Sequence, residues 1–456
     1  MSLAYFRTRL VTVLGLSLLS AAFGPAVRAG PRAEDLEHAK SGYVLRSQVF
    51  SPEARAAAVH FIDARLATAD AMTREQFLLG ILRIAAFADN GHDMESGAGD
   101  AWWPEARLPV RMLWFPQGWV VARADAANGD LLGARVLGID DLPPAEVFGR
   151  LRDYCGGVDA YRRWNLERLV EKQGLLHAAG LARHADRVSL SLQLPDGRHI
   201  RRTLKFVPKA ALPEGQISER VWSPAPWPGE TEKGWRAFAA QHTPLYLEDG
   251  AHLFRVVRIP ELEALFIQMR VHFDMDGETV ADFRQKVDAA IAADHPRHLI
   301  VDLRFDTGGN IDLTREWQRS LPGRIPGRVY VLVGPYTFSA GIVAAAAFKH
   351  DAPAQVRIVG EGVGDRLRWW SEGEDVCLPD SHYCLHLTTG LWDLVHGCAE
   401  HPSCYGDKYD ARVADLAPEL DAPITLASWL SGRDPGMEAI ERDLSRAREA
   451  QSTTSL

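Results

Sequence analysis

Short apolar segments alternate with helical segments throughout the C-terminal half of the chain, and this alternation constrains the fold more than any other feature. Strands are predicted at residues 253–258, 265–270, 298–303, 329–333 and 356–359. Helices are predicted at residues 280–293, around residue 313 and at residues 339–349. This order favours a mainly parallel sheet covered by helices. Ligands of such sheets bind beyond the carboxyl ends of the strands, so chemistry is expected in the loops at 304–310 and 334–339.

The N-terminal half predicts helices followed by antiparallel strands. Helical spacing covers residues 52–88, where Thr73 and Gln76 have the spacing of a capping box. Strands are predicted at residues 110–115, 119–124, 134–139, 188–194 and 199–207, with a helical stretch at 159–181. The stretch 208–248 is rich in Pro, Gly and Trp, and we expect a surface connection there.

These patterns together predict an α/β protein with an N-terminal helical and mixed α+β region. The expected divisions are a helical segment at 30–100, a mixed segment at 101–248 and a C-terminal α/β domain at 249–456.

The first 29 residues have the pattern of a secretory signal peptide. Arg7 and Arg9 precede an apolar run at 10–22, and Val27 and Ala29 have the spacing of a cleavage site. A membrane anchor is the alternative, but the apolar run is shorter than the roughly 20 residues that cross a bilayer. We therefore expect an exported protein, periplasmic or secreted.

The charge balance argues against a nucleic-acid partner. The chain has 51 Lys and Arg against 60 Asp and Glu, and loss of residues 1–29 would remove three arginines and leave a net charge of −12. A chain this acidic lacks the excess of basic residues that neutralises phosphates. No later segment is long and apolar enough to predict a membrane span.

Four of the five cysteines lie close together near the C-terminus. In an oxidising compartment, the simplest pairing joins Cys377 to Cys384 and Cys398 to Cys404, leaving Cys155 alone. Zinc binding is the competing interpretation, but it usually requires tighter ligand pairs. We expect no metal and no cofactor.

The first loop of interest follows the apolar strand that ends at Leu303. Gly308 and Gly309 leave backbone N–H groups unobstructed by side chains, as an oxyanion hole requires. The alternative is an ordinary strand-to-helix turn in which Asn310 or Asp312 caps the helix.

The second loop places Ser339 between a strand and an alanine-rich helix. A serine oxygen at a helix start lies near the positive end of the helix dipole, which favours the negative charge that develops on an attacked carbonyl. The alternative is an N-cap serine with no chemical role.

Several motifs occur in an order that resembles the tail-specific (C-terminal-processing) peptidases and the core of the tricorn protease. VDLRFDTGG at 301–309 is similar to their DLR-x-N-x-GG signature, and YTFSAG at 336–341 to their T-x-SA turn. IVGEG, LPDS and the segment from LAPEL to GMEAI follow in the same order over about 253–444. The resemblance implies a crotonase/ClpP-like layered domain. It also implies an acyl-enzyme on Ser339 and an oxyanion hole built from Ala340 N–H with Gly308 or Gly309 N–H.

The resemblance also implies a base. ADNGHDM at 88–94 is similar to the D-x-H-T element of family members that lack a PDZ domain, which selects His92. No lysine occurs between Val359 and Cys377, so a Ser-His arrangement is more consistent than a Ser-Lys dyad. Glu372 is the expected partner of the histidine, with Asp93 and Glu361 as other candidates.

Three positions depart from the family pattern. Asp306 replaces the usual Asn, residues 362–364 replace a Pro-Thr-Gly triplet, and the histidine is followed by Asp instead of Thr.

The motifs and the resemblance together predict an exported serine peptidase acting on peptides or proteins. A ligand-binding protein on the same scaffold and an esterase for small substrates are the alternatives. The sequence leaves the oligomeric state open.

Overall fold

The computed structural model describes residues 30–93, 103–213, 221–226, 228–240, 242–275 and 277–454. The expected signal peptide at 1–29 lies outside this part of the chain. The described residues form an α/β fold, as predicted. Within them, no helix is long and apolar enough to cross a membrane.

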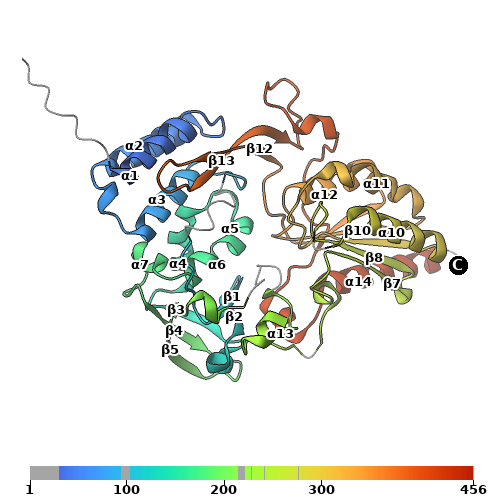
Figure 1. The fold of residues 1–456 in the computed structure, drawn as a ribbon. Helices are drawn as coiled ribbons and strands as arrows, with labels where there is room; N and C mark the ends of the chain where they lie inside the picture. Colours follow the sequence, from blue (N-terminus) through green and yellow to red (C-terminus); the bar gives the residue numbers. More distant parts are fainter. Residues whose placement is uncertain are drawn as a thin grey trace, which may run out of the picture.

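A six-stranded sheet forms the centre of the C-terminal half (Figure 1). Its strands, in spatial order, are β14 (Leu420–Asp421), β11 (Val356–Gly360), β10 (Val329–Val333), β9 (His298–Asp302), β8 (Ala264–Met269) and β7 (Phe254–Ile259). Only the β7–β8 pair is antiparallel; the other four pairings are parallel. The mainly parallel sheet expected from the sequence is confirmed.

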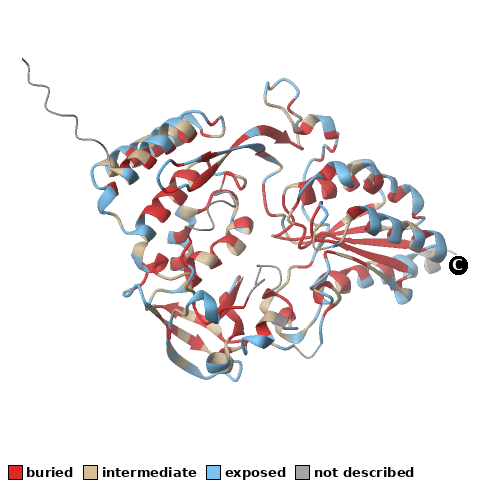
Figure 2. Cartoon of the chain, viewed as in Figure 1, coloured by how far each residue is buried: buried red, intermediate tan, exposed pale blue. Residues whose placement is uncertain are grey.

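Helices cover both faces of this sheet, which explains why its strands read as continuous apolar runs. Helices α10 (Val280–Asp294), α11 (Arg315–Ser320) and α12 (Ala340–Asp351) cover one face, and α14 (Pro435–Thr454) covers the other. Helix α13 (Leu426–Ser431) packs instead in a core shared with the N-terminal half. Successive strand residues alternate between two cores: Leu265 packs with the α10–α12 layer, whereas Phe266 packs with α14. Strands β9 and β10 are accordingly buried along their whole length (Figure 2).

The N-terminal half packs helices against an antiparallel sheet. The first helices are α1 (Pro31–His38), α2 (Pro52–Leu66) and α3 (Arg74–Ala86), and α3 begins with the predicted Thr73–Gln76 capping box. The sheet runs in the order β1 (Val110–Phe115), β2 (Gly118–Ala124), β3 (Arg135–Ile139), β4 (Arg187–Gln193) and β5 (His199–Lys205). Its helices are α4 (Pro144–Leu151), α5 (Asp159–Asn165), α6 (Glu167–Glu171) and α7 (Leu175–Ala178).

The prediction of a surface connection at 208–248 is wrong in part. The short strand β6 (Arg236–Ala237) pairs with β2, and the short helix α9 (Pro228–Glu232) precedes it. Trp222 and Tyr246 are buried in a core shared with both halves. The Trp-rich composition reflects this burial, because large aromatic side chains contribute strongly to packing.

A long hairpin that the sequence did not predict joins the two halves. Strands β12 (Arg368–Cys377) and β13 (Cys384–Asp393) pair antiparallel, and their near end packs Trp369 and Trp392 in the C-terminal core. The far end packs with the N-terminal helices, where the two carboxylate oxygens of Asp35 accept the N–H groups at 380 and 381. The hairpin therefore belongs to both cores (Figure 1).

Both expected disulfides are present. Cys377, the last residue of β12, pairs with Cys384, the first residue of β13. Cys398 pairs with Cys404 in the segment that follows β13. Cys155 is free and buried.

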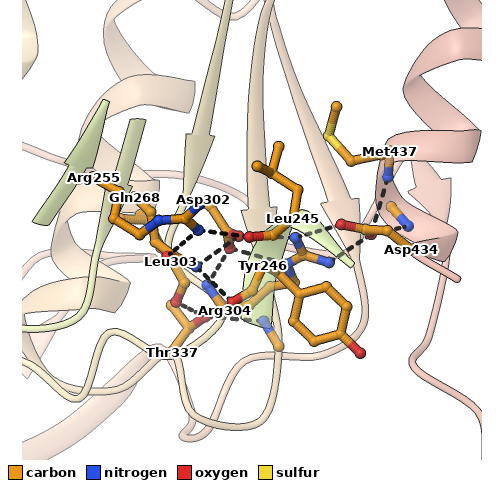
Figure 3. Close-up of polar contacts among 12 residues, drawn as sticks. Leu245, Tyr246, Arg255, Gln268, Asp302, Leu303, Arg304, Thr337, Asp434 and Met437 are labelled. Atoms are coloured by element: carbon orange, nitrogen blue, oxygen red, sulfur yellow. Dashed lines mark hydrogen bonds and ion pairs between the residues drawn. The ribbon is translucent and has the colours of Figure 1, made fainter. Parts of the chain in front are cut away.

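A buried ion cluster lies at the carboxyl end of β9 (Figure 3). The Arg304 guanidinium donates to Asp302 at 2.8 and 2.9 Å and to Asp434, before α14, at 2.8 and 3.1 Å. Asp302 also accepts from Gln268 at 3.2 Å. The cluster joins β9, β8 and the start of α14.

Replacement of Arg304 by Met should leave Asp302 and Asp434 buried without their cation. Breaking a buried ion pair from one side costs about 3–5 kcal/mol, and a decrease of that size in the free energy of unfolding is expected in urea titrations. Arg433→Met is the control, because Arg433 forms an exposed pair with Glu438. Equal stability of the two variants would contradict this role of the cluster.

Candidate active site

Ser339 occupies a strained turn between β10 and α12. Its backbone has φ 53° and ψ −120°, a region that residues other than glycine rarely occupy. It holds the N-cap position of α12, but its side chain makes no cap hydrogen bond. The interpretation of Ser339 as a simple N-cap serine is therefore wrong.

Contacts with the preceding loop hold this turn in place. Thr337 Oγ1 donates to the Leu303 carbonyl at 2.7 Å and accepts the Gly334 N–H at 2.9 Å. The Phe338 N–H donates to the Asp306 carbonyl at 2.9 Å. The two loops singled out in the sequence thus form one unit, and the surrounding bonds keep the serine in its strained conformation.

Gly308 and Gly309 lie against Ser339 with φ values of 103° and 129°. A Cβ atom on Gly308 would lie 2.6 Å from Ser339 Cβ, so only glycine fits there. The Gly308 N–H donates to Asp306 Oδ1 at 3.0 Å and is engaged. The N–H groups of Gly309 and Ala340 have no hydrogen-bond acceptor within the described part of the chain. Of the three expected oxyanion donors, these two are available.

Asp306 pairs with a buried histidine. Its Oδ2 lies 2.8 Å from Nε2 of His272, whose Nδ1 lies 2.8 Å from Thr314 Oγ1. The His272 and Asp306 side chains are fully buried. The carboxylate therefore holds the Gly308 N–H, and with it the glycine loop, through a fixed network.

Ser339, His92 and Glu372 line one cavity of about 700 Å³. Gly309 and Ala340 line it as well. The structure therefore brings the predicted nucleophile, base, carboxylate and available amide donors to a common space. Gly308 is the one expected site residue that does not line this cavity.

The loop that carries His92 is fastened to strand β12. Asn90 exchanges two hydrogen bonds with the Trp370 backbone, at 2.8 and 3.0 Å. The His92 ring stacks on Phe338, next to Ser339, with the ring centroids 4.4 Å apart. Within the described residues neither ring nitrogen has a hydrogen-bond partner, so no bond from the serine hydroxyl is formed in this state.

Among the described residues, Asp365 is the carboxylate within ion-pair distance of His92, and no sequence motif pointed to it. Its Oδ2 lies 3.7 Å from His92 Nδ1, and only 1% of its side chain is exposed. Asp365 Oδ2 has no hydrogen-bond partner in the described part of the chain. A Cβ atom on Gly91 would lie 2.9 Å from that oxygen, so glycine permits the close approach.

The three carboxylates named from the sequence are engaged elsewhere. Glu372 accepts from Ser371 Oγ at 3.0 Å and from Trp392 Nε1 at 3.1 Å. The other two face different partners: Asp93 accepts from Tyr43, Asn90 and Thr388, and Glu361 lies 3.7 Å from Arg163. Burial raises the pKa of both Asp93 and Glu361. None of the three bonds to His92.

One grouping of potential metal ligands occurs among the described residues, but its sulfurs are already bonded. Cys398, Cys404 and Asp407 bring their ligand atoms together. The two cysteines form a disulfide, and Asp407 accepts the Cys398 N–H at 3.0 Å. The cluster therefore has a structural explanation.

Fold and site together define an α/β protein with a serine at a strained strand-to-helix turn. No protein-family model and no curated protein matches the chain. Among solved structures, mature CPAF matches with a TM-score of 0.55 and 12% identity over 88% of this chain and 94% of CPAF. Mature CPAF complexed with lactacystin matches with a TM-score of 0.56 and 12% identity over 92% and 98%.

The chain therefore has the fold of mature CPAF along nearly its whole described length. The TM-score of 0.55 establishes the shared fold, whereas an identity of 12% does not extend the likeness to activity. The photosystem II D1 C-terminal processing protease and the tricorn protease also match, at TM-scores of 0.37 and 0.36. TM-scores in that range do not establish a shared fold.

Gly308→Ala should displace Ser339, because the new methyl group would overlap its Cβ. Gly197→Ala is the matched control: Gly197 also has positive φ, at 86°, but nothing lies within 4 Å of its would-be Cβ. Both substitutions strain the backbone, and Gly308→Ala alone should slow Ser339 labelling by a fluorophosphonate, by about tenfold or more. Equal labelling rates in the two variants would contradict this packing role.

Proposed function

We propose that the protein is an exported serine peptidase that hydrolyses peptide bonds through an acyl-enzyme on Ser339. The observation that carries the proposal is the strained Ser339, which faces a cavity shared with His92 and with two available backbone N–H groups. Acyl transfer requires these three parts: a nucleophile, a base and an oxyanion hole.

In the proposed reaction, Ser339 Oγ attacks the carbonyl carbon of the scissile bond while His92 Nε2 takes its proton. The oxyanion receives the N–H groups of Gly309 and Ala340. His92 then gives the proton to the departing amine, leaving an ester on Ser339. Water attacks this ester with His92 again as base, which releases the acid and restores the serine.

The carboxylate of Asp365 orients the base in this proposal. With Nδ1 of His92 facing Asp365 at 3.7 Å, Nε2 is the nitrogen left for the serine. The position of the ring proton of His92 is inferred from the neighbouring groups, because the hydrogen-bond partners of a histidine indicate which nitrogen carries the proton. Catalytic hydrogen bonds that are long in a free enzyme shorten when substrate binds. The missing Ser339–His92 bond is therefore compatible with a free state.

Export is supported by the cysteines as well as by residues 1–29. Disulfides persist in oxidising compartments, and four of the five cysteines are paired. The substrates we propose are peptides or proteins, which fit the wide, partly polar cavity around Ser339. Lactacystin, seen in a CPAF complex, is a suitable small-molecule probe of the site.

A fluorophosphonate probe followed by mass spectrometry tests the proposal directly. Labelling should occur at Ser339, disappear in Ser339→Ala and slow by about a hundredfold or more in His92→Ala, because the base activates the serine. A library of peptides then distinguishes a peptidase from an esterase. A folded protein with an unlabelled Ser339 would favour the alternative of a ligand-binding protein on the same scaffold.

Asp365→Asn should slow labelling by at least about tenfold, because a neutral partner no longer stabilises the imidazolium of His92. Glu372→Gln is the matched control, since Glu372 lines the same cavity but bonds to Trp392. Slower labelling in Glu372→Gln and not in Asp365→Asn would assign the role to Glu372, as the sequence suggested.

A further inference from the structure

A second cavity lies between the N-terminal half and the turn that leads to Ser339. It is formed by β1, α5 and α6 on one side and by residues 333–336 on the other. Its volume is about 40 Å³, room for roughly three water-sized groups. It shares no lining residue with the cavity around Ser339.

Five aromatic residues contribute to the cavity wall. The rings belong to Trp114, Trp164, Trp222, Phe305 and Tyr336. Trp164 stacks on Tyr336 with the centroids 5.1 Å apart, and Trp222 meets Tyr336 edge-on at 6.3 Å. The indole N–H groups of Trp164 and Trp222 are already bonded, to Pro335 O at 3.2 Å and to Tyr336 OH at 2.9 Å. These rings can therefore offer a ligand only their apolar edges and π faces.

One buried carboxylate in the wall has an oxygen without a partner. Glu167 is 3% exposed; its Oε1 accepts the backbone N–H of Trp114 at 3.2 Å, and its Oε2 has no hydrogen bond to any described residue. Glu171, one turn further along α6, shows the contrast: it accepts from Met112 N–H and pairs with Arg111. A buried acceptor without a donor lowers the stability of the folded protein, so a ligand that donates a hydrogen bond to Glu167 would remove this penalty.

The positive groups at this cavity are already neutralised. Arg304 donates to two carboxylates (Figure 3), and Arg163 lies 3.7 Å from Glu361 at the rim. The Arg163 and Glu361 side chains are 38% and 22% exposed, so the rim reaches the surface. Among the described residues, the remaining acceptor without a donor is Oε2 of Glu167, which favours a ligand that donates a hydrogen bond and, once this carboxyl group is ionised, a cation.

We propose that this cavity binds a small organic cation, an ammonium head group, between the aromatic faces and Glu167. An ammonium ion is attracted by ring faces and donates to a carboxylate, and both interactions strengthen in a dry site. The space limits the bound part to a head group of about three heavy atoms. A free small amine and the end of a lysine side chain share this chemistry. The proposal does not depend on the reaction proposed for Ser339.

The test is saturation-transfer NMR on the methyl signal of methylammonium with the whole protein. Methanol, which matches methylammonium in size but has no charge, and acetate are the controls. Transfer is expected for methylammonium alone. Equal transfer to methanol, or stronger transfer to acetate, would overturn the proposal. The readout does not involve Ser339, so it can fail or succeed independently of the peptidase activity.

Two variants locate the binding. Glu167→Gln keeps the acceptor for the Trp114 N–H but removes the charge, and it should weaken methylammonium binding by about tenfold or more. Trp164→Leu removes one ring face and should also weaken it. Glu361→Gln at the rim should change it by less than about threefold. Unchanged binding in both Glu167→Gln and Trp164→Leu would overturn the assignment.

The pH dependence gives a second signature. Burial raises the pKa of Glu167; Glu171 adds to the effect, and Arg111 opposes it. Since the cation prefers the charged carboxylate, binding should strengthen as pH rises through the range in which Glu167 loses its proton. This dependence should be lost in Glu167→Gln, where Glu361, Arg163 and Arg304 still face the cavity. Its persistence there would contradict the role of Glu167.

The source of the ammonium group is settled by competition. Displacement of methylammonium by Nα-acetyl-lysine methylamide would indicate a lysine side chain of a peptide or protein. Binding of methylammonium without such displacement would indicate a free small amine.

Discussion

The buried ion cluster of Arg304, Asp302 and Asp434 is the interaction on which the site depends. Asp302 ends β9 and accepts both the backbone N–H and the guanidinium of Arg304, which fixes the chain as it leaves the sheet. The residue after Asp302 is Leu303, whose carbonyl accepts a hydrogen bond from Thr337 in the Ser339 turn. A charged anchor therefore sets the position of the glycine loop, and the glycine loop sets that of the serine. A purely apolar contact would not impose such directional constraints.

The sequence predicted the C-terminal sheet well because its central strands β8, β9 and β10 are buried on both faces. Where apolar runs alternate with helical segments, a continuous apolar run such as 329–333 indicates a strand that is buried on both faces. The β12–β13 hairpin escaped prediction because much of β12 is exposed and its pattern is interrupted at Glu372 and Gly373, both of which have positive φ. Positive φ at a non-glycine residue is set by tertiary contacts and cannot be read from composition.

The candidate site was predictable only where a local motif carried it. Ser339, Gly309 and Ala340 lie in two short motifs, and His92 lies in a third. Asp365 and His272 were missed because their significance comes from neighbours distant in sequence: Asp365 meets His92, and His272 meets Asp306. An acidic residue in the loop after β11 was the one available signal for Asp365.

The shared hairpin has a consequence for when the site can exist. His92 is made early in synthesis, but the strand that fastens its loop begins at residue 368, and the far end of that hairpin completes the N-terminal core. A chain emerging in order thus carries its histidine long before anything holds it beside the serine. The constellation is completed only after most of the polypeptide has been delivered and both cores have closed. A chain still in transit therefore lacks the assembled site.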